Sequence, residues 1–254
     1  MRLKFSKFLV VFLVIGVLTL GGCSTENVTS STSTPGEPNT TTSVSETINE
    51  SVPGMKDLPR LEGKATVVMT VNGSPITIEV DGTNAPITAG NFVDLVEKGV
   101  YDGLVFHRVV REPEPFVVQG GDPQSKDPKF PTNRLGTGGY VDPAIGTERR
   151  IPLEITPQGA DSPIYGKTLE SARVSQPPQL QHKMGAVAMA RSQMPDSASS
   201  QFYFTLADLA FLDGSYAVFG NVTEGFDIVN KIQQGDRIES ATVTQGAENL
   251  KTPE

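Results

Sequence analysis

Short runs of apolar residues, broken by glycine, proline, asparagine and aspartate, extend from Leu58 to the end of the chain. Such runs, with apolar and polar positions alternating in several of them, are typical of strands with one buried face. The predicted strands are Ala65–Val71, Ile76–Val80, Leu104–Val110, Phe116–Gln119, Gly185–Ala190, Gln201–Leu206, Tyr216–Val222 and Ile238–Val243. Eight short strands predict a β-sandwich or a closed barrel.

Two segments place apolar residues at the three- and four-residue spacing of a helix and then reach a glycine. These segments are Phe92–Gly99 and Phe226–Gly235. The stretches 123–150 and 156–183 are long, polar and rich in glycine and proline. Loops of this length in a compact domain are usually functional or mobile. We therefore expect eight strands, two helices and two long loops.

The first 22 residues have the features of an export signal. Three basic residues precede an apolar run of thirteen residues, Phe8–Leu20. This run is shorter than the roughly 20 residues of a membrane-spanning helix, so we interpret residues 1–22 as a secretory signal peptide. The segment Leu20–Cys23, Leu-Gly-Gly-Cys, resembles the bacterial lipobox, in which Cys23 carries a diacylglyceryl group after cleavage. The alternative is a signal peptide that happens to contain a cysteine.

Residues 23–57 differ in composition from the rest of the chain. Fifteen of the 34 residues from 24 to 57 are serine or threonine, and none is aromatic. Such a stretch buries too little apolar surface to offset the entropy of ordering it. We interpret residues 23–57 as a lipidated cysteine followed by a disordered tether, and residues 58–254 as the folded domain. An ordered extension packed on that domain is the alternative.

Charge and cysteine content exclude several classes of protein. The 254 residues carry a formal net charge of −8, which argues against nucleic acid as a partner because phosphate binding needs clustered lysine and arginine. One cysteine and two histidines provide neither a disulfide framework nor the ligands of a zinc site. We therefore expect no metal.

Five sequence blocks, in this order and approximate spacing, resemble the cyclophilin family of peptidyl-prolyl cis-trans isomerases. The blocks are Phe106–Val110, Phe116–Asp122, Ser200–Phe204, Phe211–Gly214 and Val218–Gly220. The resemblance covers roughly residues 64–245. Three further segments, Ile151–Ile155, Tyr165–Glu170 and Gly235–Ser240, are similar to the branch found in cyanobacteria and in the thylakoid lumen of plants.

The chemistry of proline isomerisation explains why apolar residues and a hydrogen-bond donor are enough for catalysis. Amide resonance gives rotation about the prolyl bond a barrier of roughly 18–20 kcal/mol, and no bond is broken in crossing it. A catalyst therefore needs an apolar socket for the proline ring and a donor that favours the twisted nitrogen. Period-two alternation places Arg108 on one strand face with Phe106 and Val110, and Gln201 on another with Tyr203.

The resemblance implies a mainly β fold, a closed eight-stranded antiparallel barrel capped by two α-helices, which agrees with the count above. It implies that Arg108 is the catalytic cation, that Gln119 orients Arg108 and the substrate carbonyl, and that His107 has an ancillary part. The substrate-binding residues that it implies are Phe116, Val117, Ala190, Arg191, Gln201, Tyr203, Phe211 and Leu212. It implies no cofactor.

Departures from the family pattern affect the pocket. The loop Arg111–Pro115 is three residues longer than the family's. Tyr203 stands where many relatives have phenylalanine, so its hydroxyl needs a partner if the ring is buried. Val117 replaces a methionine and Arg191 a common asparagine. Because the arginine and both glutamines are retained, we expect activity with an altered substrate preference.

Two further departures concern inhibitor binding. Family members that bind cyclosporin tightly usually have tryptophan at the position of Phe211, and the position of Tyr216 is often histidine. The indole N–H of tryptophan donates a hydrogen bond to an inhibitor carbonyl, and phenylalanine has no donor. We therefore expect weak inhibition by cyclosporin.

The sequence thus predicts a monomeric prolyl isomerase that assists the folding of exported proteins at the cell envelope. Its expected partners are proline-containing polypeptides and, through the lipid anchor on Cys23, a membrane on the periplasmic or thylakoid-lumen side. The alternative is a proline-binding chaperone or assembly module that keeps the groove but has little turnover.

Overall fold

The structure is a computed structural model that describes residues 54–253. The predicted signal peptide, Cys23 and most of the predicted tether lie outside the described residues. The end of that tether is described, and Met55–Asp57 form a 3-10 helix, η1. Met55 is 3% exposed and belongs to the hydrophobic core. The folded part therefore includes Met55, three residues before the predicted boundary at Leu58.

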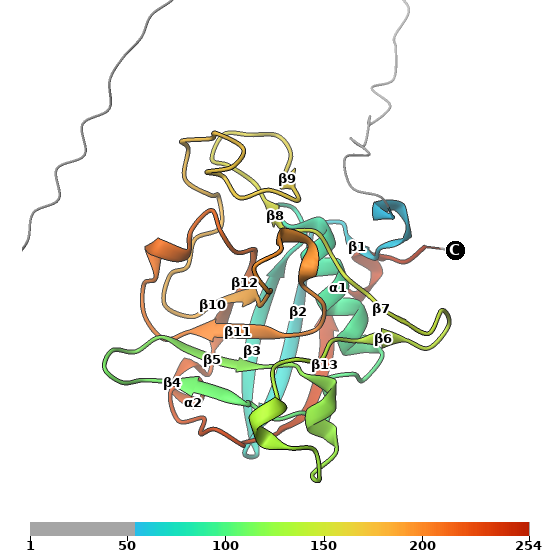
Figure 1. Ribbon diagram of the computed structural model, residues 1–254, viewed down its shortest axis with the longest axis vertical. Coiled ribbons are helices and arrows are strands. Elements are labelled where there is room, and N and C mark those ends of the chain that lie inside the picture. Colours follow the sequence, from blue (N-terminus) through green and yellow to red (C-terminus); the bar gives the residue numbers. More distant parts are fainter. Residues whose placement is uncertain (1–53, 254) are drawn as a thin grey trace, which may run out of the picture. The chain divides into compact units, whose positions relative to one another are not determined.

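Eight antiparallel strands form one sheet, and each of them overlaps one of the predicted strands (Figure 1). In order across the sheet they are β13 (Ile238–Gln245), β2 (Lys64–Val71), β3 (Ser74–Asp81), β12 (Val218–Glu224), β10 (Ala186–Met189), β11 (Phe202–Thr205), β5 (Val117–Gly120) and β4 (Arg108–Val110). The run predicted from Leu104 is a strand only from Arg108.

The prediction of a closed barrel is wrong, because the sheet is open between β13 and β4. A single bridge, Val105 to Arg237, joins the chain before β4 to the chain before β13. The backbone of Leu104 and its neighbours bonds to the turn before β13, with Ile238 N donating to Leu104 O at 2.8 Å. Val105 N donates to the Ser125 hydroxyl at 3.1 Å. The backbone groups of residues 104–106 therefore bond to groups outside the pairing of β4 with β5. For this reason β4 begins at Arg108 and not at the predicted Leu104.

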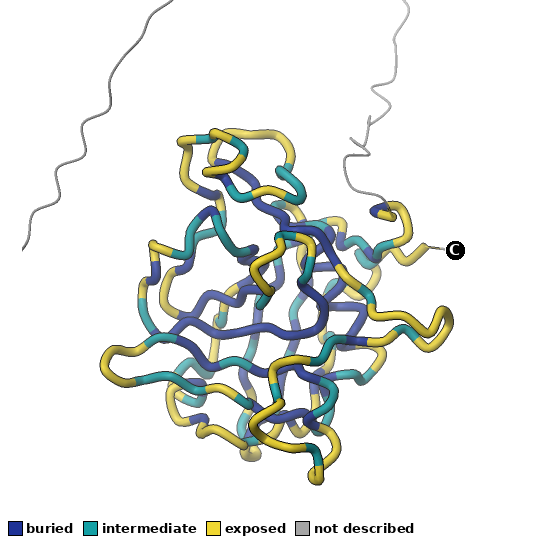
Figure 2. The backbone as a smooth tube through the Cα atoms, in the orientation of Figure 1, coloured by how far each residue is buried: buried dark blue, intermediate teal, exposed yellow. Residues whose placement is uncertain are grey.

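The core lies on the concave side of this sheet, where alternation along the strands places every second side chain. In β2 the residues at positions 65, 67, 69 and 71 are buried and those between them are partly exposed. Figure 2 shows the buried residues concentrated in the strands and the exposed ones in the loops. An aromatic cluster fills the core and includes Phe92, Tyr101, Phe106, Phe202, Phe204 and Phe219.

The first predicted helix is α1 (Pro86–Glu97), which begins at a proline, a residue suited to the first helical turn. The carboxylate of Glu154 accepts hydrogen bonds from the amides of Ile87 (3.1 Å) and Thr88 (2.7 Å) at this N-terminus. The second helix, α2 (Phe226–Val229), is shorter than expected. Ile232 remains 1% exposed, but its amide bonds to Val229 O in a tighter turn. Between residues 54 and 253, no helix is long and apolar enough to cross a membrane.

Short pairs of strands that the periodicity did not predict organise the chain ends and the long loops. They are β1 (Arg60–Leu61) with β14 (Leu250–Lys251), β6 (Val141–Asp142) with β7 (Thr147–Glu148), and β8 (Glu154–Ile155) with β9 (Ile164–Tyr165). Two residues are too few to show a period, so only the folded context identifies them. The 3-10 helices after η1 are η2 (Pro123–Lys126), η3 (Thr132–Arg134), η4 (Pro195–Ser197), η5 (Ala210–Leu212) and η6 (Ala247–Asn249).

Candidate functional site

A pocket of about 220 Å³ lies over β4, β5 and β11 and the segments that follow β10 and β11. Its nine lining residues are Arg108, Phe116, Val117, Gln119, Ala190, Arg191, Tyr203, Leu212 and Tyr216. Eight of these were predicted as site residues, and the structure brings them together from five separate stretches of the chain. Strand register is the cause, because Gln119 pairs with Arg108 on one side and with Tyr203 on the other.

A directional chain of hydrogen bonds runs from Arg108 along one side of the pocket. Arg108 Nη1 donates to Gln119 Oε1 at 3.2 Å, and Gln119 Nε2 donates to Gln201 Oε1 at 3.1 Å. Gln201 Nε2 then donates to the carbonyl of Gly138 at 2.7 Å. Each amide therefore has a fixed orientation, and the oxygen of Gln119 faces the guanidinium. The contact expected between Gln119 and Arg108 is present.

The loop that ends this chain is held by a buried carboxylate. Asp122 is 0% exposed, and its Oδ2 accepts from the amides of Gly136 (2.6 Å) and Gly138 (3.2 Å). A side chain at position 138 would place its Cβ 2.4 Å from Asp122 Oδ1. Glycine is therefore required for the loop to wrap closely around Asp122.

The apolar wall of the pocket consists mainly of Phe116, Val117, Tyr203 and Leu212. Val117 and Tyr203 are 2% and 5% exposed, whereas Arg108 is exposed. The guanidinium of Arg108 lies 5.4 Å from the centre of the Phe116 ring, within the range of a cation–π contact. The pocket thus places a rigid apolar surface beside an exposed cation.

Tyr203 has the hydroxyl partner that its burial requires, and this partner was not predicted. Its oxygen lies 3.0 Å from His182 Nε2, and His182 Nδ1 lies 2.8 Å from Asp213 Oδ1. Burial lowers the pKa of His182, although Asp213 opposes the shift. Neutral His182 then donates to Asp213 and accepts from Tyr203. No sequence motif joins positions 182 and 203; they meet because the chain before β10 lies beside the chain after β11, where Leu209 N donates to His182 O.

Three predicted site residues do not line the pocket. Gln201 lines an adjacent depression of about 340 Å³, which shares Gln119, Ala190 and Arg191 with the pocket. Phe211 is 73% exposed and stacks on Phe116 with ring centres 6.0 Å apart. His107 lies behind the Gly136 loop, and both of its ring nitrogens are buried with no hydrogen-bond partner among the described residues.

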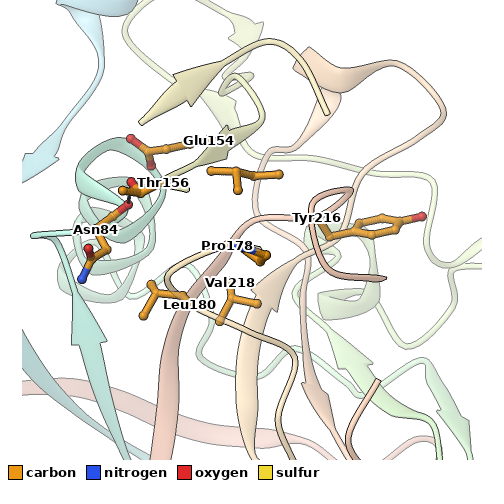
Figure 3. Close-up of a pocket in the computed structure, with 8 residues that line it drawn as sticks. Asn84, Glu154, Thr156, Pro178, Leu180, Tyr216 and Val218 are labelled. Atoms are coloured by element: carbon orange, nitrogen blue, oxygen red, sulfur yellow. Dashed lines mark hydrogen bonds between the residues drawn. The ribbon is translucent and has the colours of Figure 1, made fainter. Parts of the chain in front are cut away.

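Tyr216 is a lining residue outside the predicted site set. It lies beneath the guanidinium of Arg191, 4.6 Å from ring centre to Cζ. Tyr216 also borders a cavity of about 10 Å³ between the pocket and α1, lined by Glu154, Thr156 and others (Figure 3). Its ring points away from that cavity in Figure 3. This space holds at most one water molecule, so the larger pocket is the candidate site.

The ring nitrogens of His107, which are buried without a hydrogen-bond partner among residues 54–253, predict that acid weakens the fold. Burial lowers the pKa of His107, with Arg108 acting in the same direction and Asp122 opposing. The unfolded chain takes up a proton near pH 6.5, whereas the folded chain takes it up only at lower pH, so the free energy of unfolding falls as pH drops below 6.5. We expect the loss between pH 7 and pH 5 to be smaller in His107→Leu, by about 1.4 kcal/mol for each unit of pKa difference removed.

Urea unfolding of both proteins at the two pH values measures this difference. The variant loses no hydrogen bond, because the ring nitrogens of His107 have no partner among residues 54–253. An identical pH dependence in the two proteins would contradict the prediction.

The fold and the pocket define a class of protein: an antiparallel β domain with a pocket whose apolar wall lies beside an exposed guanidinium. None of the nine lining side chains is a serine, a cysteine or a carboxylate. Such a site fits conformational catalysis of a peptide better than hydrolysis by a side-chain nucleophile.

The comparisons with known proteins identify the family. Residues 66–250 match the model described as "Cyclophilin type peptidyl-prolyl cis-trans isomerase/CLD". The chain therefore belongs to the cyclophilin-type peptidyl-prolyl cis-trans isomerase family.

Among curated relatives, a putative thylakoid lumen peptidyl-prolyl cis-trans isomerase of Synechocystis is 43% identical over 204 residues, which cover 76% of this chain and 50% of the relative. A chloroplastic peptidyl-prolyl cis-trans isomerase of Arabidopsis thaliana is 39% identical over 219 residues, 78% of this chain and 46% of the relative. The chain spans about half the length of these two relatives.

A crystal structure of a cyclophilin-type isomerase of Cryptosporidium parvum matches with a TM-score of 0.53 and 22% identity, covering 72% of this chain and 98% of that one. This match supports the fold.

Proposed function

We propose that the protein catalyses the cis–trans isomerisation of prolyl peptide bonds. The observation that carries the proposal is the placement of Arg108, held by Gln119, beside an apolar pocket. In the planar ground state the prolyl nitrogen shares its electron pair with the carbonyl, and in the twisted state that pair is free to accept a hydrogen bond. A guanidinium positioned there stabilises the twisted state more than the planar one, which lowers the barrier.

The remaining residues hold the substrate. Phe116, Val117, Tyr203 and Leu212 provide apolar surface for the proline ring. Because the Tyr203 hydroxyl is hydrogen-bonded to His182, the polar end of this ring is satisfied away from the proline. Family membership supports this assignment.

A coupled isomerisation assay on an Ala-Pro peptide, with the purified protein, tests the proposal. We expect acceleration above the uncatalysed rate. Binding of the peptide without acceleration would favour the second candidate, a proline-binding chaperone. The observation that favours this candidate is that three pocket positions depart from the family pattern, namely Val117, Arg191 and Tyr216. If the protein neither binds the peptide nor accelerates its isomerisation, both candidate functions are overturned.

We further propose that the protein acts on exported proteins at the cell envelope. The apolar run Phe8–Leu20 and the Leu-Gly-Gly-Cys segment ending at Cys23 support export and lipid anchoring. The names of the two relatives place those proteins in the thylakoid lumen and the chloroplast, which is consistent with a site beyond the cytoplasmic membrane.

If Cys23 is lipidated, the mature protein should partition with membranes, and Cys23→Ser should interfere with processing and remove the thiol that carries the lipid. One acyl-bearing residue with a diacylglyceryl group inserts two chains, enough for stable anchoring. Fractionation and mass spectrometry of the processed N-terminus measure both effects. Wild-type protein recovered without lipid and wholly in the soluble envelope fraction would refute the anchor.

A further inference from the structure

Two arginines provide all the charge in the lining of the candidate site. Of the nine lining residues only Arg108 and Arg191 are ionisable at neutral pH, and both are cations. Among the described residues, neither forms an ion pair with a carboxylate; the partners of Arg108 are an amide oxygen and an aromatic ring. The site is therefore locally positive in a chain of net charge −8.

Arg191 is held in place by groups that do not cancel its charge. Its Nε and Nη2 donate to Ser215 O at 2.9 and 2.6 Å, and its Nη1 donates to Ser192 O and Gln193 O at 2.8 and 3.2 Å. The planar group also lies over the ring of Tyr216. Carbonyl dipoles and a ring face orient the guanidinium but leave its full positive charge.

Strand order places the two cations on opposite sides of the pocket residues Tyr203 and Val117. The sheet runs β10, β11, β5, β4, and two residues of the apolar wall, Tyr203 and Val117, lie on β11 and β5. Arg191 follows β10, and Arg108 lies on β4. A peptide whose proline lies between them therefore has a guanidinium near both of its flanks.

We propose that the site prefers substrates with a carboxylate side chain next to the proline, and that Arg191 is the residue that confers this preference. The inference rests on the proposed isomerase function and adds its substrate class. Arg191 discriminates between acidic and neutral substrates because its fixed guanidinium can attract a carboxylate. Arg108, by contrast, is the donor assigned to the prolyl nitrogen. The positive pocket attracts a carboxylate next to the substrate proline. The negative charges on the rest of the protein are farther away and screened by solvent, so they do not cancel this attraction.

The acidic groups nearby are already engaged. The carboxylate of Asp213 accepts hydrogen bonds from the backbone amide and the ring of His182, and His182 in turn contacts the wall residue Tyr203. In the adjacent depression Glu148 lies 3.4 Å from Arg150, so these two charges offset each other. Neither carboxylate forms an ion pair with Arg191.

The experiment compares blocked peptides that differ only before the proline: Glu-Pro, its neutral isostere Gln-Pro, and Lys-Pro. Blocked ends exclude a terminal carboxylate as the source of any effect. With the full protein at low salt we expect kcat/KM for Glu-Pro to exceed that for Gln-Pro by about two- to fivefold, the range of a partly exposed ion pair. Lys-Pro should be slower than Gln-Pro, and both ratios should approach one at 0.5 M salt, where charges are screened. A second series places the same residues after the proline.

Variants assign the effect to Arg191. Arg191→Gln should bring the Glu-to-Gln ratio close to one, and Arg191→Lys should keep most of it, because charge and not loop geometry carries the preference. Lys64→Gln removes the same charge from β2, outside the pocket, and should leave the ratio as in the wild type. Equal rates for the Glu and Gln peptides in both series, or a ratio that survives Arg191→Gln, would overturn the inference. Failure to accelerate any peptide would instead overturn the proposed function.

Discussion

Replacing Arg108 with alanine should lower kcat/KM for prolyl isomerisation at least tenfold, which corresponds to about 1.4 kcal/mol or more of transition-state stabilisation. The reason is that Arg108 is the donor placed beside the apolar pocket, with its guanidinium 3.2 Å from the oxygen of Gln119. The loss should appear in the catalytic step as well as in binding, because a hydrogen bond to the prolyl nitrogen forms only when that nitrogen leaves the amide plane. A coupled assay on an Ala-Pro peptide measures it.

The fold should tolerate this change. Arg108 is exposed, and its contacts with Gln119 and the Phe116 ring lie at the surface of the sheet edge. The melting temperature of the variant should therefore stay close to that of the wild type. Arg134→Ala is the matched control, since Arg134 is also exposed and stacks on an aromatic ring, that of Phe130, but does not line the pocket. A folded Arg108→Ala protein with undiminished activity would refute the assignment.

Cyclosporin should inhibit the active protein only weakly. We expect its affinity to be roughly ten to one hundred times lower than for a family member with tryptophan at the position of Phe211. Phe211 lies at the rim, 73% exposed, and stacks on Phe116 at the mouth of the pocket. A phenyl ring there keeps the packing surface but offers no N–H, so a bound inhibitor carbonyl loses water without gaining a partner. The cost of such an unpaired group is about 1–3 kcal/mol.

Phe211→Trp should therefore recover part of the affinity, while Phe211→Leu, which also lacks a donor and loses the ring, should not. Inhibition of the coupled assay across a cyclosporin series gives the three constants. The exposure of Phe211 makes the substitutions compatible with folding, because little packing around the ring has to change. Nanomolar inhibition of the wild type would show that the donor at this position is dispensable.

Several site residues were predictable because their positions follow from local pattern and from the family blocks. Arg108 and Gln119 lie on adjacent strands, and antiparallel pairing of those strands is sufficient to bring them together. Phe116 lies in the pocket despite the longer loop, because that loop extends the hairpin beyond the bond between Phe116 N and Val110 O. His182 was not predictable in this way, since its partners Tyr203 and Asp213 are 21 and 31 residues distant.

His107 shows the limit of transfer from sequence. It is adjacent to Arg108 and shares its sequence block, yet alternation along the chain turns the two side chains to different surroundings. Arg108 is exposed at the pocket, whereas the ring nitrogens of His107 are buried behind the Gly136 loop. Alternation thus decides which of the two neighbours faces the groove, and a loop some thirty residues farther along the chain covers the other.

The sequence by itself determined the eight strands and the first helix, because strand and helix periods are local properties of the chain. Arg108 and Gln119 were singled out only through the resemblance of their sequence blocks to the cyclophilin family. Only the tertiary structure decided that the sheet stays open between β13 and β4 and that Tyr203 donates to His182. It also decided that backbone carbonyls fix the guanidinium of Arg191 over the ring of Tyr216. These features depend on which distant backbone and side-chain groups satisfy each other's hydrogen bonds, and residues far apart in sequence carry no periodic signal of that choice.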